Sequence, residues 1–317
     1  MRHLRGLLTL CLFMATLGMS SAILAAANAD EEKEVPKDLV LRGDAKCTTC
    51  HDENDSPKVL KIGKTIHGVN ADSRTPTCTD CHGASEVHIK EAGRGGKKAP
   101  PTDVVFGEKS HSSAEEQSGA CLSCHKKDAE RSHWEGSAHQ GRDVTCSSCH
   151  KMHGGYNKLL TKKNEIDVCV SCHLDVRADI YKRSKHPLRD SSSASGAGKM
   201  TCSSCHNPHG ARGEKMVNAN SFNDKCYECH TEKKAPLLWE HSPVKEDCLT
   251  CHNPHGSSND KLLATKVPRL CQQCHMQGRH QTAALATNSI FAVERSCLNC
   301  HAMVHGSNHP SGSVLQR

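Results

Sequence analysis

Apolar side chains gather at the start of the chain, and the remainder is mostly polar. The run Gly6–Leu24 is largely apolar and follows a short basic start. Ala27–Ala29 fits the small-x-small pattern of a cleavage site, and a charged stretch follows it. This order is typical of a secretory signal peptide. We therefore expect residues 1–29 to be removed on export and the mature chain to be Asp30–Arg317.

Beyond this segment the pattern predicts little regular structure. No apolar run approaches the ~20 residues that span a bilayer as a helix, and no series of alternating strands suggests a membrane barrel. Two stretches, Gly93–Pro101 and Asp190–Lys199, have the Gly, Pro and Ser content of loops. We expect mostly short α-helices separated by irregular loops, with almost no sheet.

Composition indicates what holds such a chain together. Only 3% of the 317 residues are aromatic, and the mean hydropathy is −0.60. These values leave too few large apolar side chains for an ordinary core, and exclude a typical TIM barrel, Rossmann enzyme or β-sandwich. Disorder fits poorly with 21 cysteines and 24 histidines. The composition therefore indicates a bound cofactor that is present many times.

The cysteines identify that cofactor. Cys11 lies in the expected signal peptide, and each of the other twenty belongs to a Cys-x-x-Cys pair that is followed directly by His. Disulfides or zinc sites are alternatives, but neither requires that histidine. Cys-x-x-Cys-His is the attachment site of haem c, so we expect ten covalently bound haems, two thioethers each, with the adjoining histidine as the proximal iron ligand.

The expected thioether cysteines are Cys47, Cys50, Cys78, Cys81, Cys121, Cys124, Cys146, Cys149, Cys169, Cys172, Cys202, Cys205, Cys226, Cys229, Cys248, Cys251, Cys271, Cys274, Cys297 and Cys300. The expected proximal ligands are His51, His82, His125, His150, His173, His206, His230, His252, His275 and His301. Ten haems in Asp30–Arg317 leave about 29 residues per haem. The porphyrins must then pack near one another and serve as the hydrophobic core.

The other histidines repeat with the motifs. Each even-numbered motif has one further histidine before it and one after it, which gives five two-haem units and ten candidate distal ligands. These candidates are His67, His88, His139, His153, His186, His209, His241, His255, His280 and His305. Such a repeat predicts an elongated array rather than a compact globule.

Three histidines of the mature chain fall outside this repeat. We expect His111, His133 and His309 to be solvated surface residues. His133 competes with His139 for the same role, but His139 precedes its motif by seven residues, as His241 does.

Chain reach limits which iron a distal histidine can serve. His209 follows the proximal His206 by three residues, and three residues span at most ~10 Å. His209 therefore cannot reach the opposite face of the same haem, and we expect it to bind a neighbouring one. The same holds for His153, His255 and His305. The sequence leaves the rest of the pairing open.

Two histidine ligands leave iron no open position for a substrate, which indicates electron transfer. A multihaem nitrite or hydroxylamine oxidoreductase is the alternative, but its open haem is often marked by a Lys variant of the motif, which this sequence lacks. The net charge of +6 is not evidence for nucleic-acid binding. About twenty haem propionates would make the mature holoprotein roughly −6 when oxidised.

The sequence resembles the MtrA/MtoA/DmsE family of decahaem cytochromes over almost the whole mature chain. The resemblance rests on the ten motifs, both HNPHG segments and three stretches: Lys182–Leu188 (KRSKHPL), Leu238–Val244 (LWEHSPV) and Ser296–Gly312. It implies two pentahaem halves, which we place at residues 30–190 and 191–317.

The resemblance also implies a role. Members of the family insert into an outer-membrane β-barrel porin and carry electrons between the periplasm and the cell surface, in extracellular iron oxidation or reduction. Expected partners are that porin, periplasmic or inner-membrane cytochromes, and a cell-surface multihaem cytochrome or extracellular Fe. A free periplasmic shuttle and a donor subunit of an outer-membrane terminal reductase, of the DMSO reductase type, remain alternatives.

Overall fold

The computed structural model describes residues 45–52, 54–68, 74–92, 94, 98–154, 162, 164–188, 200–234, 236–275 and 296–316. The chain divides into two compact units, Met1–Leu39 and Val40–Arg317, and every described residue belongs to the second. The expected signal peptide, the Asp190–Lys199 loop and the expected boundary between the two halves lie outside the described residues.

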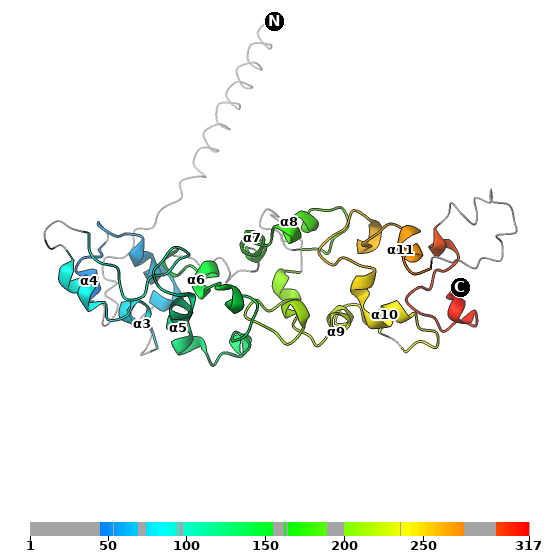
Figure 1. Ribbon diagram of the computed structural model, residues 1–317, viewed down its shortest axis with the longest axis horizontal. Coiled ribbons are helices and arrows are strands. Elements are labelled where there is room, and N and C mark those ends of the chain that lie inside the picture. The colour runs from blue at the N-terminus through cyan, green and yellow to red at the C-terminus, as the bar shows by residue number, and fades with distance from the viewer. Residues whose placement is uncertain are drawn as a thin grey trace, which may run out of the picture. The chain divides into compact units, whose positions relative to one another are not determined.

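The described chain consists of short helices joined by irregular segments (Figure 1). The α-helices are α2 (Ala45–Thr48), α3 (Cys78–His82), α4 (Glu86–Glu91), α5 (Ala114–His125), α6 (Cys146–Cys149), α7 (Glu165–Val170), α8 (Leu174–Ile180), α9 (Phe222–Tyr227), α10 (Ser242–Glu246) and α11 (Arg269–Gln272). The 3-10 turns are η1 (Val59–Lys64), η2 (Ile66–Gly68), η4 (Ala129–Arg131), η5 (Gln140–Arg142), η6 (Met152–Gly154), η8 (Cys202–Ser204), η9 (Glu214–Met216), η10 (Thr231–Lys233), η11 (Cys248–Thr250), η12 (Asp260–Leu262), η14 (Cys297–Asn299) and η15 (Gly312–Val314).

Within this part of the chain, β-structure is limited to isolated bridges, such as that between His206 and Val217. The predicted fold class of short helices and irregular loops with almost no sheet is therefore confirmed.

Even-numbered motifs begin a helical turn at their first cysteine. The residue before that cysteine is Thr or Ser or Asp, and it caps the turn. Thr77 accepts a hydrogen bond from the backbone N–H of Asp80, and Asp247 accepts one from the N–H of Leu249. Such a cap satisfies an N–H that has no partner inside the turn. The cap therefore fixes where the turn starts in α3, η11 and η14. In α6 and η8 the N–H of Thr145 or Thr201 instead donates to the hydroxyl of Ser148 or Ser204.

Odd-numbered motifs instead lie at the C-terminal ends of helices α2, α5, α7, α9 and α11. The longest, α5, starts at a capping box between Ser113 and Glu116 and ends at His125. In both forms the motif closes one helical turn; the N–H of His150, for example, donates to the carbonyl of Cys146 at 2.9 Å. Positions i, i+3 and i+4 share one helix face. Both sulfurs and the imidazole of a motif are thus presented on the same side.

The two HNPHG segments make equivalent loops. Gly210 has φ +107° and Gly256 has φ +154°, and a Cβ at either would overlap a backbone carbonyl, of His133 or of Asp179 respectively. Glycine is required at both positions because of the positive φ and the close approach. Each glycine thus lets the loop pack directly against a preceding segment.

Apolar packing between side chains is sparse among the described residues. One small cluster joins Ile166 and Val170 of α7 to Ile180 of α8. Trp134, Val217 and Leu315 are the other buried apolar side chains in the described segments. This small number of buried apolar side chains is consistent with a core that is made by bound cofactors.

None of the helices in the described segments is both long enough and apolar enough to span a bilayer.

Candidate haem centres

Nine of the predicted proximal histidines each face one predicted distal histidine across about the same distance. The pairs, with the distance between ring centres, are His51–His88 (6.1 Å), His67–His125 (6.0 Å), His82–His153 (6.0 Å), His139–His173 (6.1 Å), His150–His209 (6.2 Å), His186–His230 (6.5 Å), His206–His255 (6.1 Å), His241–His275 (6.2 Å) and His252–His305 (6.1 Å). The tenth proximal histidine is His301, and the remaining candidate, His280, lies outside the described residues.

This spacing has a chemical meaning. Direct ring stacking would bring the planes much closer, whereas a metal–imidazole bond is about 2 Å long and the ring centre lies about 1 Å beyond the nitrogen. Two imidazoles on opposite sides of one metal ion therefore place their ring centres about 6 Å apart. The separations of 6.0–6.5 Å fit one iron between each pair.

Hydrogen bonds from the Nδ1 atom orient many of these rings. The Nδ1 atom of proximal His82 donates to the carbonyl of Val104 at 2.9 Å, and that of His252 donates to the carbonyl of Lys261 at 2.8 Å. A ring that donates from Nδ1 keeps the lone pair on Nε2 for a metal. Such hydrogen bonds fix both the tautomer and the ring orientation of a metal ligand.

Distal histidines follow the same principle in a repeating way. His139 donates from Nδ1 to the carbonyl of Pro208, and His186 donates to that of Pro254. Each of these carbonyls belongs to the residue that directly precedes a distal histidine of the next unit. The same contact recurs between His241 and Val304. These hydrogen bonds connect successive units of the repeat.

Burial keeps several of the distal rings neutral. It is the main cause that lowers the pKa of His67, His209, His255 and His305 below the ordinary value. A neutral imidazole is the form that binds a metal ion. The surroundings therefore favour the ligand form of these side chains before any metal is bound.

The Nδ1 atom of His125 has a carboxylate as its partner instead of a backbone carbonyl. Its Nδ1 lies 2.9 Å from the carboxylate oxygen of Asp128, which also bonds the guanidinium of Arg131. Hydrogen bonds from His125 and Arg131 lower the pKa of Asp128. The Nε of Arg131 is buried and has no hydrogen-bond partner among the described residues. A buried cationic donor of this kind suits an anionic group such as a haem propionate.

The sulfur atoms of successive motifs also meet. The sulfur of Cys121 lies close enough to that of Cys146 to lower the pKa of the Cys146 thiol below its ordinary value. Cys169 and Cys202 form the same contact in the next two motifs. Haems attached at such neighbouring sulfurs would have edges close together.

Glu165 joins the second of these sulfur pairs to form a cluster with the geometry of a metal site. Its carboxylate, however, accepts hydrogen bonds from the backbone and hydroxyl of Ser203. Both cysteines of the cluster also belong to Cys-x-x-Cys-His motifs, so this cluster is part of the haem attachment region.

The pairs follow a rule along the chain. A proximal histidine of an even motif faces the distal histidine that follows the next even motif, as His150 faces His209. A proximal histidine of an odd motif from the third onward faces the distal histidine that precedes the previous even motif, as His173 faces His139. The first motif breaks this rule, because no even motif precedes it, and His51 faces His88.

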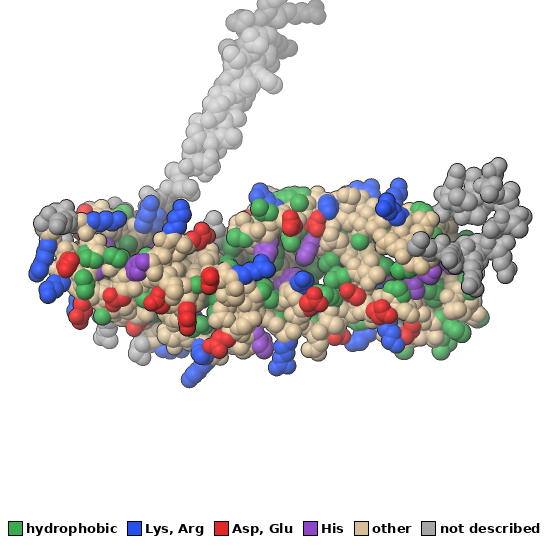
Figure 2. All heavy atoms as spheres, viewed as in Figure 1, with side chains coloured by type: hydrophobic (Ala, Val, Ile, Leu, Met, Phe, Trp, Pro, Cys, Tyr) green, Lys and Arg blue, Asp and Glu red, His purple; other side chains and the backbone are tan. Residues whose placement is uncertain are grey.

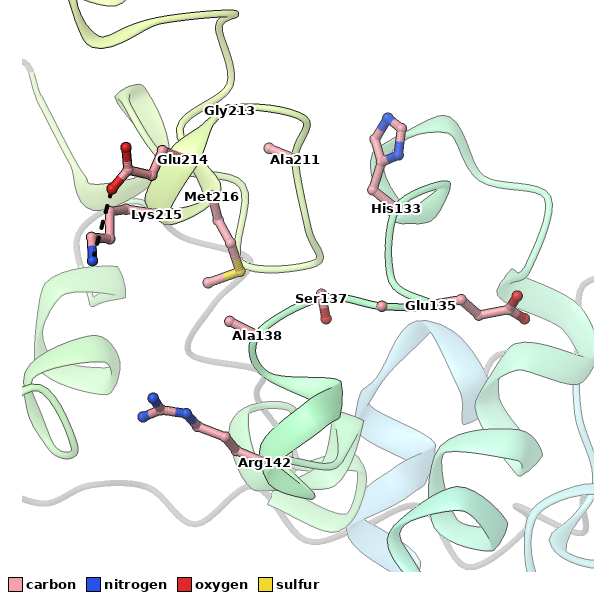
Figure 3. A pocket seen from close by; sticks show the side chains of 11 residues that line it. His133, Glu135, Ser137, Ala138, Arg142, Ala211, Gly213, Glu214, Lys215 and Met216 are labelled. Carbon is pink, nitrogen blue, oxygen red and sulfur yellow. Dashed lines mark ion pairs between the residues drawn. The ribbon is translucent and has the colours of Figure 1, made fainter.

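The three histidines outside the repeat do not face a proximal histidine in any of these nine pairs. His309 accepts a hydrogen bond at Nδ1 from the N–H of Ser311. His133 lines a cavity of about 500 Å³ together with Arg142, Ala211 and Met216, and His133 and Arg142 lie on different sides of it (Figure 3). The cavity borders His139 through Ala138, so it belongs to the surroundings of the histidine pairs.

The drawn face of the molecule carries both acidic and basic side chains (Figure 2). Figure 2 shows histidine side chains reaching the drawn face at several points, with acidic and basic side chains interspersed along it. The contacts with carbonyls, Asp128 and the caps could not be named from the motifs alone. The caps had a sequence signal, because Thr, Ser or Asp directly precedes every even motif.

Residues 195–235 and 241–280 match a family described as a doubled CXXCH motif, and residues 78–172 match one described as cytochrome c-type protein NrfB-like. Together with the facing histidines, these matches define a multihaem c-type cytochrome with covalently bound haem c. It is an electron carrier.

Comparison of whole chains identifies the family. The chain is 45% identical over 289 residues to the multihaem cytochrome MtrA of Shewanella baltica (strain OS185), covering 87% of this chain and 82% of that protein. It belongs to the MtrA family of multihaem cytochromes, as the resemblance in the sequence implied. The cytochrome c-type protein NrfB of Escherichia coli O6:H1 (strain CFT073) is 29% identical over 56% of this chain and 92% of its own length.

Proposed function

We propose that this protein carries electrons through ten bis-histidine haems across an outer membrane, inside a β-barrel porin partner, for extracellular iron oxidation or reduction. The observation that supports the haem arrangement is the series of nine facing histidine pairs at 6.0–6.5 Å. The family supports the place of the protein in the cell: exported, in the periplasm and associated with the outer membrane.

The residues of the chain have distinct roles in this proposal. The twenty cysteines of the motifs attach the haems, and the adjoining histidines bind iron from one side. The distal histidines, with His280 as the partner of His301, close the other side and exclude substrate. Haem c, when bound, supplies a reversible one-electron iron couple.

Crossed ligation makes the series rigid. His153, which follows the fourth motif, faces His82 of the second motif, and its Nδ1 donates to the carbonyl of Val59 near the first. Each unit is thereby tied to its neighbours through ligands as well as through backbone. Fixed neighbouring haems let an electron pass along the series without large movement of the chain.

The chemistry of the chain supports a porin partner. Polar, irregular backbone is not tolerated in contact with lipid, and only a closed barrel would shield it at that depth. Periplasmic or inner-membrane cytochromes would exchange electrons at one end. A surface multihaem cytochrome or extracellular Fe would exchange them at the other.

Vesicles test this proposal directly. We expect vesicles that contain the protein and its cognate barrel to let external dithionite reduce an encapsulated redox dye, and to pass electrons in reverse when the driving force is reversed. Vesicles with the barrel alone or the cytochrome alone should not. Equal rates with and without the barrel, or no transfer with both, would contradict the conduit and favour a periplasmic shuttle or a reductase donor subunit.

A further inference from the structure

The proximal His125 is supported by a charged partner, unlike several of its counterparts. His82, His206 and His252 each donate from Nδ1 to a backbone carbonyl. The Nδ1 of His125 instead lies 2.9 Å from the carboxylate of Asp128, three residues along the chain.

Donor and acceptor capacities settle the direction of this hydrogen bond. A carboxylate only accepts and a guanidinium only donates. Arg131 also approaches Nδ1 of His125, at 3.3 Å, but it cannot accept the proton there. The Nδ1–H of His125 therefore donates to Asp128, and Arg131 binds the same carboxylate. The imidazole keeps its Nε2 lone pair for iron.

A negative acceptor changes the ligand. A hydrogen bond to a carboxylate raises the basicity of a metal-bound imidazole, and a more basic ligand stabilises ferric over ferrous iron. Second-shell hydrogen bonding is one of the means by which a protein sets a haem potential. We propose that Asp128, acting through His125 as a positioning residue, lowers the reduction potential of the haem attached at Cys121 and Cys124. This inference rests on the proposed iron between His67 and His125.

The chain offers a matched control. Glu232 lies 3.7 Å from Nδ1 of the proximal His230 and is close to Lys233. The arrangement has the same charges as Asp128 and Arg131, but the distance is beyond that of a hydrogen bond. Glu232 therefore tests the effect of a nearby carboxylate without the hydrogen bond.

The same haem should have its own spectroscopic signature. The rings of His67 and His125 lie at 89° to each other, whereas the other facing pairs have angles from 4° for His51–His88 to 51° for His139–His173. Perpendicular imidazole planes leave two iron d orbitals nearly degenerate, which gives a low-spin EPR signal with a large maximum g value. Among the nine described pairs, this angle is found at His67 and His125 alone, so the signal lets the potential of their haem be followed.

The test is an EPR-monitored redox titration of the mature holoprotein and its Asp128→Asn variant. The asparagine amide oxygen accepts the same hydrogen bond without the charge. We expect the midpoint of the large-g signal to move to higher potential while the spin state and the other haems stay unchanged. Glu232→Gln should move no midpoint appreciably. An unchanged midpoint in Asp128→Asn, or an equal shift in both variants, would overturn the inference.

A further variant separates this inference from the proposal on which it rests. His67→Ala should remove the large-g signal and create one high-spin haem. If it does, and Asp128→Asn still shifts nothing, the role of Asp128 is wrong and the ligation stands. If His67→Ala leaves every low-spin signal intact, His67 is not a ligand and the iron between His67 and His125 is itself contradicted.

Discussion

The histidine rings of this protein are oriented by their second nitrogen. His139, His186 and His241 each donate from Nδ1 to a backbone carbonyl, so their Nε2 atoms remain available for a metal. Because the carbonyl belongs to the chain that carries the next distal histidine, one contact orients a ring and positions a neighbouring loop.

His209 is the sharpest test of crossed ligation. It faces His150 of the fourth motif across 6.2 Å, although it is only three residues from His206. We expect His209→Ala to leave every thioether in place and to convert the haem at Cys146 and Cys149 to a high-spin, five-coordinate or water-bound form. The measurement is the high-spin signal in EPR and absorbance spectra, with the haem content measured in parallel.

His309→Ala is the matched control for this variant. Its ring accepts a hydrogen bond from Ser311 and faces no proximal histidine in the nine pairs, so the spectra should not change. A high-spin haem in His309→Ala, or none in His209→Ala, would contradict the assignment of distal ligands.

At this scale the sequence predicts which histidines are candidates but not their partners. The seven-residue spacing before the fourth motif singles out His139 rather than His133, and it is His139 that faces a proximal ring, His173. That contact joins two different motifs, and the spacing of histidines along the sequence does not predict which motifs come together. No sequence motif marks Asp128 as the partner of His125, because a carboxylate three residues after a histidine is common on any protein surface.

The helical elements alternate between two local forms. Odd motifs end a helix, as α5 does at His125, and even motifs begin a turn at a capped cysteine, as α3 does at Cys78. The residue before each even motif is Thr, Ser or Asp, which is the preference of an N-cap. This alternation could have been predicted from the sequence. It shows that the two motifs of each two-haem unit have different local structures, in a fixed order along the chain.

The HNPHG loops depend on their glycine. A Cβ at Gly210 would overlap the carbonyl of His133, and the backbone there has φ +107°. We expect Gly210→Ala to lower the free energy of unfolding by about 1–3 kcal/mol, the usual cost of such strain, as measured by guanidinium denaturation of the holoprotein.

Gly141→Ala is the control for this loop. A Cβ there meets no atom within 4 Å, so the alanine should leave the denaturation midpoint nearly unchanged. Equal effects of the two alanines would show that the Gly210 loop does not pack as described.

For the molecule as a whole, the sequence predicts the fold class well and the pairing poorly. The deficit of large apolar side chains is matched by the small cluster around Ile166 and Val170, since the cofactors replace a side-chain core. The ligand order is set by how each unit meets the next in three dimensions. It becomes visible only where contacts such as His153–Val59 join segments that are far apart in the sequence.

The mass of the exported protein tests the attachment of the cofactors. We expect the intact mass to equal Asp30–Arg317 plus ten haems, because each of the twenty motif cysteines should form a thioether. Thiol titration and metal analysis of the same sample should find neither free thiols nor zinc. A lower haem count accompanied by zinc would mean that some motifs bind metal instead.

The central claim is that a distal histidine closes every haem iron. Near-infrared magnetic circular dichroism of the oxidised mature protein tests it most directly, because it distinguishes bis-histidine low-spin haem from other ligation and can be quantified against total haem. We predict that all ten haems are bis-histidine and low-spin at neutral pH. A high-spin population of about one haem per chain or more would contradict this account and indicate an open iron for substrate.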